Sequence, residues 1–100
     1  MKYLVSGDQV TPAASHKDQI NFLECAKEWV EKSKADGKLD AAYSFPDGGG
    51  MFVLDAKDHE ELMRLLLNFP LRPFSNLEIR PLLDFNTSAN ITIEALKPFV

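Results

Sequence analysis

The chain has 100 residues, of which 45% are hydrophobic and 26% are charged, and its formal net charge is −4. A chain of this length buries one core, and this composition is typical of a folded globular protein rather than a disordered segment, so we expect a single domain spanning residues 1–100. The acidic balance leaves no basic stripe for phosphate groups, which argues against nucleic acid as a partner.

The cysteine count and the lengths of the apolar runs bear on the compartment. Cys25 is the only cysteine, so the chain can form neither an internal disulfide nor a zinc site built on two cysteines. No apolar run approaches the ~20 residues of a membrane-spanning helix, and the first residues do not have the pattern of an export signal. We expect a cytoplasmic protein with no membrane partner.

The first third of the chain predicts a strand followed by a long helix. Residues 2–6 include aromatic and β-branched side chains and precede Gly7, which favours a strand. Thr11-Pro12 and Ser15 with Asp18 are alternative start signals for the helix, and Asp36-Gly37 is its expected end. The apolar residues of the helix recur every three or four positions and comprise Phe22, Leu23, Ala26, Trp29 and Val30.

The middle of the chain predicts a β-hairpin. Residues 39–45 alternate between apolar and other side chains, which is the period of a strand. The segment 46–50 reads Pro-Asp-Gly-Gly-Gly, which favours a turn that needs positive φ. Residues 51–54 are apolar at consecutive positions, so this strand presents hydrophobic side chains to both faces of its sheet.

The last part of the chain predicts a helix, a stiff connector and a strand. Asp58 and Glu61 have capping-box spacing at the start of a helix expected over residues 58–68. Pro70 and Pro73 stiffen the connector, and Pro81 marks the end of a strand over residues 77–80. In the tail we expect one helical turn around residues 92–96.

The predicted order is strand, helix, strand, strand, helix, strand, which is the split βαβ arrangement of a ferredoxin-like α+β fold. Its four-stranded antiparallel sheet carries both helices on one face. The other face is open and partly apolar, so we expect it to pair with a second copy to form a homodimer or higher oligomer. The tail, about residues 84–100, could cross onto the partner subunit.

Four segments resemble the carboxyl-terminal half of the muconolactone isomerase family: residues 52–56, 58–62, 65–74 and 77–82. The most specific part is the segment Phe69-Pro70-Leu71-Arg72-Pro73-Phe74 leading into Leu77-Glu78-Ile79-Arg80-Pro81-Leu82. The resemblance implies a dimeric α/β barrel with a pocket between sheet and helices in each subunit. It also implies a 1,3 proton shift in an unsaturated lactone that bears a carboxylate, with no metal or organic cofactor.

Such chemistry requires a base next to a carbonyl and a cation that holds the carboxylate. The candidate catalytic residues are Lys27, where the resemblance places a basic residue, Asp8, where it places an acid, and His16, which could titrate near neutral pH. Each also has an ordinary interpretation, as a surface ion pair, a turn cap or a solvated helix end. The candidate substrate-binding residues are Glu24, Trp29, Tyr43 and Arg80, of which the two aromatic ones could equally belong to the core.

Three functional hypotheses follow. The first is an isomerase-like protein that binds a small, partly apolar carboxylate or lactone. The second is a cofactor-independent monooxygenase of the dimeric barrel type, with Phe22, Trp29 and Tyr43 around an aromatic pocket. The third is a dimer that binds a ligand without catalysis or has only a structural role. The third is favoured by the apolar residues Leu4, Val10 and Ala26, which occupy positions where the resemblance implies polar groups.

Overall fold

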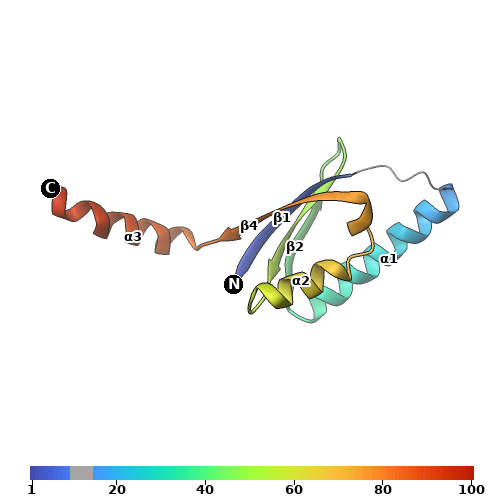
Figure 1. Cartoon of the computed structure of the whole chain (residues 1–100), viewed down its shortest axis with the longest axis horizontal. Helices are drawn as coiled ribbons and strands as arrows, with labels where there is room; N and C mark the ends of the chain where they lie inside the picture. The colour runs from blue at the N-terminus through green and yellow to red at the C-terminus, as the bar shows by residue number, and fades with distance from the viewer. Residues whose placement is uncertain (10–14) are drawn as a thin grey trace.

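Four antiparallel strands form one sheet in the computed structural model, which describes residues 1–9 and 15–100 (Figure 1). The strand order is β2-β3-β1-β4. The bounds are β1 Lys2–Gln9, β2 Leu39–Ser44, β3 Gly50–Asp55 and β4 Ser75–Leu82. The helices are α1 His16–Ala35, α2 His59–Leu67 and α3 Phe85–Leu96, with two short 3-10 turns at Arg72–Phe74 and Lys97–Phe99. The ferredoxin-like α+β fold is confirmed.

The register of the sheet decides which side chains meet the helices. Val5 lies opposite Phe52 of β3 and Ile79 of β4, so these three share one face. This is the helix face, because Val5 and its neighbour Leu54 belong to the buried core. The core consists of Tyr3, Val5, Leu39, Leu54, Ala56, Leu62 and Leu66. The opposite side, the open face, carries the alternate residues of each strand, including Leu4, Met51 and Val53.

Two side-chain caps begin the helices that cover the sheet. Ser15 precedes α1 and its hydroxyl accepts a hydrogen bond from the Asp18 amide at 3.1 Å, which confirms the second of the two predicted starts. The alternative start at Thr11-Pro12 lies outside the described residues. Asp58 caps α2 by accepting from the Glu61 amide at 2.9 Å, as the capping spacing predicted. Gly37 ends α1 with φ 71°, again as predicted.

Two strands are longer than the sequence indicated. β1 continues to Gln9 because β4 pairs with it along its whole length, from Lys2 opposite Leu82 to Gln9 opposite Ser75. Pro81 therefore lies inside β4 and does not end it. A proline is tolerated there because β4 is an edge strand, on which a missing amide donor leaves no neighbouring carbonyl unpaired.

The alternation in residues 39–45 predicted the strand correctly but not its faces. The register shifts between Leu39 and Ala41, so Asp40 forms a bulge. Leu39 is consequently buried on the helix face, whereas Ala41 and Tyr43 pair with Val53 and Met51 on the open face.

The tail contains three turns of helix rather than the single turn expected at residues 92–96. Asp84 is the reason, because its carboxylate accepts from the Thr87 amide at 3.2 Å and starts α3 at Phe85. No side chain of α3 is buried. Figure 1 shows α3 extending away from the sheet, which makes the molecule 63 Å long but only 28 Å by 21 Å across.

Candidate functional site

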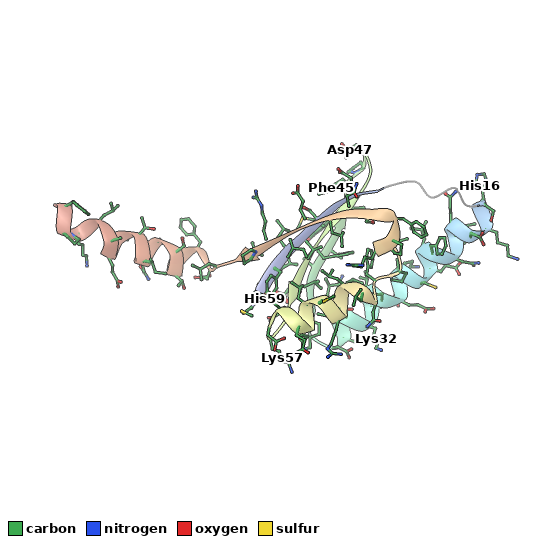
Figure 2. All side chains as sticks on the ribbon, in the orientation of Figure 1. His16, Lys32, Phe45, Asp47, Lys57 and His59 are labelled. Atoms are coloured by element: carbon green, nitrogen blue, oxygen red, sulfur yellow. The ribbon has the colours of Figure 1, made fainter. Side chains whose placement is uncertain are left out.

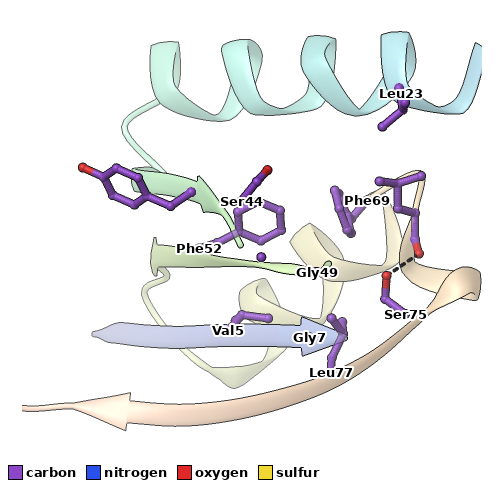
Figure 3. Close-up of a pocket in the computed structure, with 12 residues that line it drawn as sticks. Val5, Gly7, Leu23, Ser44, Gly49, Phe52, Phe69, Ser75 and Leu77 are labelled. Atoms are coloured by element: carbon purple, nitrogen blue, oxygen red, sulfur yellow. Dashed lines mark hydrogen bonds between the residues drawn. The ribbon is translucent and has the colours of Figure 1, made fainter. Parts of the chain in front are cut away.

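A cavity of about 150 Å³ lies between the helix face of the sheet and the connector that follows α2 (Figure 3). We call it the main cavity. It is lined by Val5, Gly7, Leu23, Tyr43, Ser44, Gly49, Gly50, Phe52, Phe69, Leu71, Ser75 and Leu77. An apolar cavity of this size accommodates a ring the size of benzene. The position confirms the expectation of a pocket between sheet and helices.

Aromatic rings form the back wall of the main cavity. The rings of Phe52 and Phe69 meet edge to face with centroids 4.9 Å apart. Trp29 packs behind both, with its ring centroid 5.2 Å from that of Phe52 and 4.9 Å from that of Phe69. The indole Nε1 of Trp29 donates to the Leu65 carbonyl at 3.2 Å, which fixes the ring between α1 and α2. The wall is therefore rigid, and Trp29 lies one layer behind the lining.

The turn that precedes β3 closes the cavity by bringing two backbones together. A Cβ on Gly49 would lie 2.1 Å from the Gly7 carbonyl oxygen, and Gly49 has a φ of +83°. Only glycine fits such a position without displacing β1. Ser44 and Ser75 supply the side-chain hydroxyls of the lining, and Ser75 donates to the Leu71 carbonyl at 2.9 Å.

The described residues of the lining include no lysine, arginine, histidine, aspartate or glutamate. Its single titratable residue, Tyr43, lies opposite Met51 on the open face and is 67% exposed, so only its backbone reaches the cavity. A buried carboxylate needs a paired cation or several donors. The described lining therefore suits an uncharged ring.

A second hollow, which we call the polar cleft, lies on the other side of the same strands. It is lined by Ser6, Gly7, Asp8, Phe45, Asn76, Leu77 and Glu78. Ser6 pairs with Glu78 and Asp8 with Asn76, which places all four on the open face. The sheet thus separates the carboxylates of the polar cleft from the main cavity.

The three candidate catalytic residues do not meet at one point. Asp8 lies in the polar cleft, whereas Lys27 and His16 are exposed on α1, which covers the other face. Figure 2 shows His16 at the amino-terminal end of α1. Lys27 follows Leu23 of the main cavity by four residues, so both lie on the same stripe of the helix.

The candidate binding residues are also dispersed. Trp29 supports the cavity wall, and Glu24 is exposed on α1 next to Leu23. Tyr43 and Arg80 both lie on the open face, where Arg80 pairs with Leu4. Phe22, named for an aromatic pocket, instead packs on Phe74 with ring centroids 5.0 Å apart. The roles assigned to all these residues from the sequence stay predictions.

The main cavity uses residues that the sequence reasoning did not select, notably Phe69, Ser44 and Ser75. Phe69 belongs to the connector segment that carried the family resemblance. Gly49 belongs to the glycine run, which was interpreted only as a turn. The sequence alone does not contain the strand register that would have identified this lining. Val5, Gly7 and Phe52 come to lie close together only because β1 pairs with β3.

The groups with shifted pKa values lie at the other end of the sheet. Lys38 donates to Glu61 at 2.8 Å, and this hydrogen bond raises the pKa of Lys38 and lowers that of Glu61. Lys2 hydrogen-bonds Asp40, which raises the pKa of Lys2. These pairs join the edges of the fold and take no part in the main cavity.

Two further kinds of feature are absent from the described parts of the chain, residues 1–9 and 15–100. No group of three or more His, Cys, Asp or Glu side chains is arranged to hold a metal ion there. No helix in these ranges is both long and apolar enough to cross a membrane.

Comparison with known proteins gave a family match and similar solved structures. The family described as muconolactone delta-isomerase matches residues 1–88. No match was found among curated proteins. A crystal structure of muconolactone isomerase has a TM-score of 0.77 at 19% identity, covering 84% of this chain and 90% of the other.

A second similar structure is 5-chloro-2-hydroxyhydroquinone dehydrochlorinase from Burkholderia phenoliruptrix AC1100, solved in complex with 2,5-dihydroxybenzoquinone. Its TM-score is 0.65 at 14% identity, covering 87% of this chain and 98% of the other. At these identities both likenesses establish the fold.

Proposed function

Because the chain belongs to the muconolactone delta-isomerase family, we propose that it binds a small lactone bearing a carboxylate, with the ring in the main cavity and the carboxylate at its mouth. The observation that carries this proposal is the lining of the main cavity, which is apolar and has room for one ring. A carboxylate inside would lose its hydration without gaining a cation. It would therefore stay outside.

Lys27 is the residue we assign to the carboxylate. Leu23 lines the cavity one helical turn before Lys27, and helix side chains tilt toward the amino-terminal end, so the Lys27 side chain leans toward the mouth. Lys27 forms no ion pair among the described residues. A flexible, exposed ammonium at the rim is suited to hold an anion without being buried itself.

The proposed reaction is a cofactor-independent 1,3 proton shift in the bound lactone. Removal of a proton next to the ring carbonyl produces an enolate, and return of the proton to the other end of the allylic system moves the double bond. Lys27 would stabilise the negative charge at the mouth, and Glu24, about one turn before it on α1, would take up the proton and return it. Asp8 is separated from this cavity by the sheet of its own subunit, so we assign it no step there.

Binding and turnover test different parts of this proposal. Trp29 is the only tryptophan and packs on Phe52 and Phe69, so its fluorescence reports occupancy of the main cavity. We expect a lactone with a carboxylate and the same lactone without it both to change the Trp29 signal. Lys27→Ala should weaken the binding of the charged ligand only, roughly tenfold. Lys34→Ala, two turns further along α1, should leave the binding of both ligands unchanged.

Turnover is followed by the absorbance of the enol-lactone after addition of muconolactone. We expect activity in the wild type that Lys27→Ala lowers. Binding without turnover would reject the isomerase proposal and leave a ligand-binding protein. No fluorescence change with either ligand would reject the proposed use of the main cavity.

A quinone-type ligand is the second candidate. The aromatic wall of Phe52 and Phe69 favours it, and the similar dehydrochlorinase was solved with a dihydroxybenzoquinone. Oxygen uptake with aromatic hydroquinones tests a monooxygenase reaction. This candidate has less support than the first, because the Tyr43 and Phe22 side chains lie outside the main cavity.

We also propose that two copies pair through their open faces. Leu4, Met51, Val53 and Tyr43 lie on this side of the sheet, and none of the described helices covers them. Burial of such a surface removes apolar area from water and closes the two sheets into a barrel.

A further inference from the structure

The hydroxyl of Ser75 is held in one position by the connector that follows α2. Its Oγ donates to the Leu71 carbonyl at 2.9 Å. The amide of Ser75 donates to the Arg72 carbonyl and closes the 3-10 turn Arg72–Phe74. Because the backbone and the side chain of Ser75 are tied to the same turn, the orientation of the hydroxyl is set before any ligand binds.

This hydroxyl also belongs to the main cavity. Ser75 and Leu77 are two residues apart on β4, so their side chains lie on the same face of the sheet. Leu77 pairs with Gly7, which follows the buried Val5 by two residues, so this is the helix face. Both Ser75 and Leu77 line the cavity, and Ser75 is half-buried there among mostly apolar neighbours.

The hydrogen bond to Leu71 determines what Ser75 offers to a ligand. A serine hydroxyl has one proton and two lone pairs, whereas a carbonyl oxygen only accepts. Since the Leu71 carbonyl uses the proton, the Ser75 oxygen presents lone pairs and acts as an acceptor. A ligand carbonyl could bind Ser75 only if the bond to Leu71 broke. A ligand hydroxyl adds one hydrogen bond and breaks none.

Ser44 supplies the other side-chain hydroxyl of the described lining, and its situation differs. It lies on β2, the opposite edge strand of the sheet, and it is exposed. Its side chain forms no hydrogen bond among the described residues. The Ser44 hydroxyl can therefore donate or accept, and water competes for it. These properties make Ser44 a matched control for Ser75.

The position of Ser75 relative to the mouth of the cavity bears on the shape of the ligand. α1 packs on β2 at one edge of the sheet, whereas Ser75 lies on β4 at the other edge. Figure 3 shows Leu23 on the α1 side of the main cavity and Ser75 on the β4 side. A ring whose carboxylate is held at the mouth by Lys27 therefore turns its opposite side toward Ser75.

We infer that the ligand carries a hydrogen-bond donor, a hydroxyl, on the ring position opposite its carboxylate, and that Ser75 accepts from this donor. The inference rests on the proposed function, because it takes the ring and the carboxylate to be placed as assigned there. It narrows the ligand class to hydroxylated ring carboxylates. Ser75 thereby determines specificity, as an acceptor whose only proton is already in use.

Three substituted benzoates test the inference by isothermal titration calorimetry. The first, 4-hydroxybenzoate, has a hydroxyl opposite its carboxylate. The second, 4-fluorobenzoate, is nearly the same size but has no donor, and 3-hydroxybenzoate has its hydroxyl at a different ring position. We expect the wild type to bind 4-hydroxybenzoate roughly tenfold more tightly than either of the others. A change in Trp29 fluorescence reports that the ligand occupies the main cavity.

Variants of the two serines separate the role of the acceptor from that of the turn. Ser75→Ala should bind 4-hydroxybenzoate roughly tenfold more weakly and 4-fluorobenzoate as the wild type does, so the preference disappears. Ser75→Thr keeps the hydroxyl and should keep the preference, as should the control Ser44→Ala. A preference that survives in Ser75→Ala would overturn the inference. Loss of both ligands in Ser75→Ala would also overturn it, since Ser75 would then only support the turn.

Failure of the inference is distinguishable from failure of the proposed function. Equal binding of 4-hydroxybenzoate and 4-fluorobenzoate by the wild type, with weaker binding of both by Lys27→Ala, would overturn the inference and leave the proposed site in place. Absence of binding by all three benzoates would reject the proposed site together with the inference that rests on it.

Discussion

Trp29 and Leu65 join the two helices that cover the sheet, since the indole Nε1 of Trp29 donates to the Leu65 carbonyl at 3.2 Å. Leu65 lies in the last turn of α2, where carbonyls lack partners within the helix. The same indole packs on Phe52 and Phe69, the back wall of the main cavity. One side chain thus couples the position of α2 to the shape of the cavity.

Trp29→Phe should therefore lower the free energy of unfolding by about 1–2 kcal/mol, because the Leu65 carbonyl loses its donor while much of the ring packing survives. Trp29→Ala should cost more, about 3–5 kcal/mol, since it also leaves a cavity. Urea unfolding followed by circular dichroism measures both. Equal losses in the two variants would show that the hydrogen bond contributes nothing.

The Lys38–Glu61 pair should make stability depend on pH in the acid range. The hydrogen bond from Lys38 holds the pKa of Glu61 below its ordinary value of 4.5, so folding favours the ionised carboxyl. The stabilisation is therefore present above pH 4.5 and is lost as the pH falls through the lowered value in the folded protein. Glu61→Gln should reduce the difference in urea midpoint between neutral pH and acid.

Glu60→Gln is the matched control for this pH dependence. Glu60 pairs with Arg64 on the exposed side of the same helix, where its side chain is 75% accessible and well screened. We expect the control to follow the wild-type profile. A profile for Glu61→Gln identical to that of the control would contradict the role of the Lys38 pair.

The two positive-φ glycines of the hairpin should respond differently to alanine. Gly48 has a φ of +115° and nothing lies within 4 Å of an added Cβ, so Gly48→Ala should cost only backbone strain, about 1–2 kcal/mol. At Gly49 the added Cβ would also collide with the Gly7 carbonyl oxygen, so β1 and the hairpin must separate. We expect a loss above about 3 kcal/mol and weaker ligand binding. Similar unfolding midpoints for the two variants would contradict the close approach.

Most of the elements follow from local signals in the sequence. The caps at Ser15 and Asp58 and the stop at Gly37 each act within a few residues, so the ends of the helices that they define were predictable. The cap at Asp84 acts over the same distance and was overlooked, which is why α3 was expected as a single turn.

The faces of the strands and the lining of the site depend on pairing between distant residues. The bulge at Asp40 reverses the face of every later residue of β2, and no pattern in residues 39–45 predicts this bulge. The resemblance predicted that Asp8 and Lys27 both belong to the catalytic site. The register places them on opposite sides of the sheet, a relationship that no local pattern contains.

The mouth of the main cavity should be sensitive to a charge introduced at Leu23 but not to one introduced a turn earlier on α1. Leu23 lines the cavity yet is 52% exposed, so Leu23→Glu changes the mouth without disturbing the core. We expect Leu23→Glu to weaken the binding of the carboxylate-bearing lactone more than tenfold, by repulsion and loss of apolar contact. Leu23→Lys should weaken this binding less. Ile20→Glu, 55% exposed one turn earlier, is the control. Equal effects at both positions, read by Trp29 fluorescence, would contradict the assigned mouth.

Val53 is the position at which pairing through the open face should be most vulnerable. It lies on the open face, opposite Leu4 of β1 and Ala41 of β2, near the middle of the sheet. Val53→Asp would bring a carboxylate and its symmetry mate into an apolar interface, which should weaken association at least about a hundredfold. Light scattering should find dimers of the wild type and monomers of Val53→Asp, and dimers of both would rule out the open face as the interface.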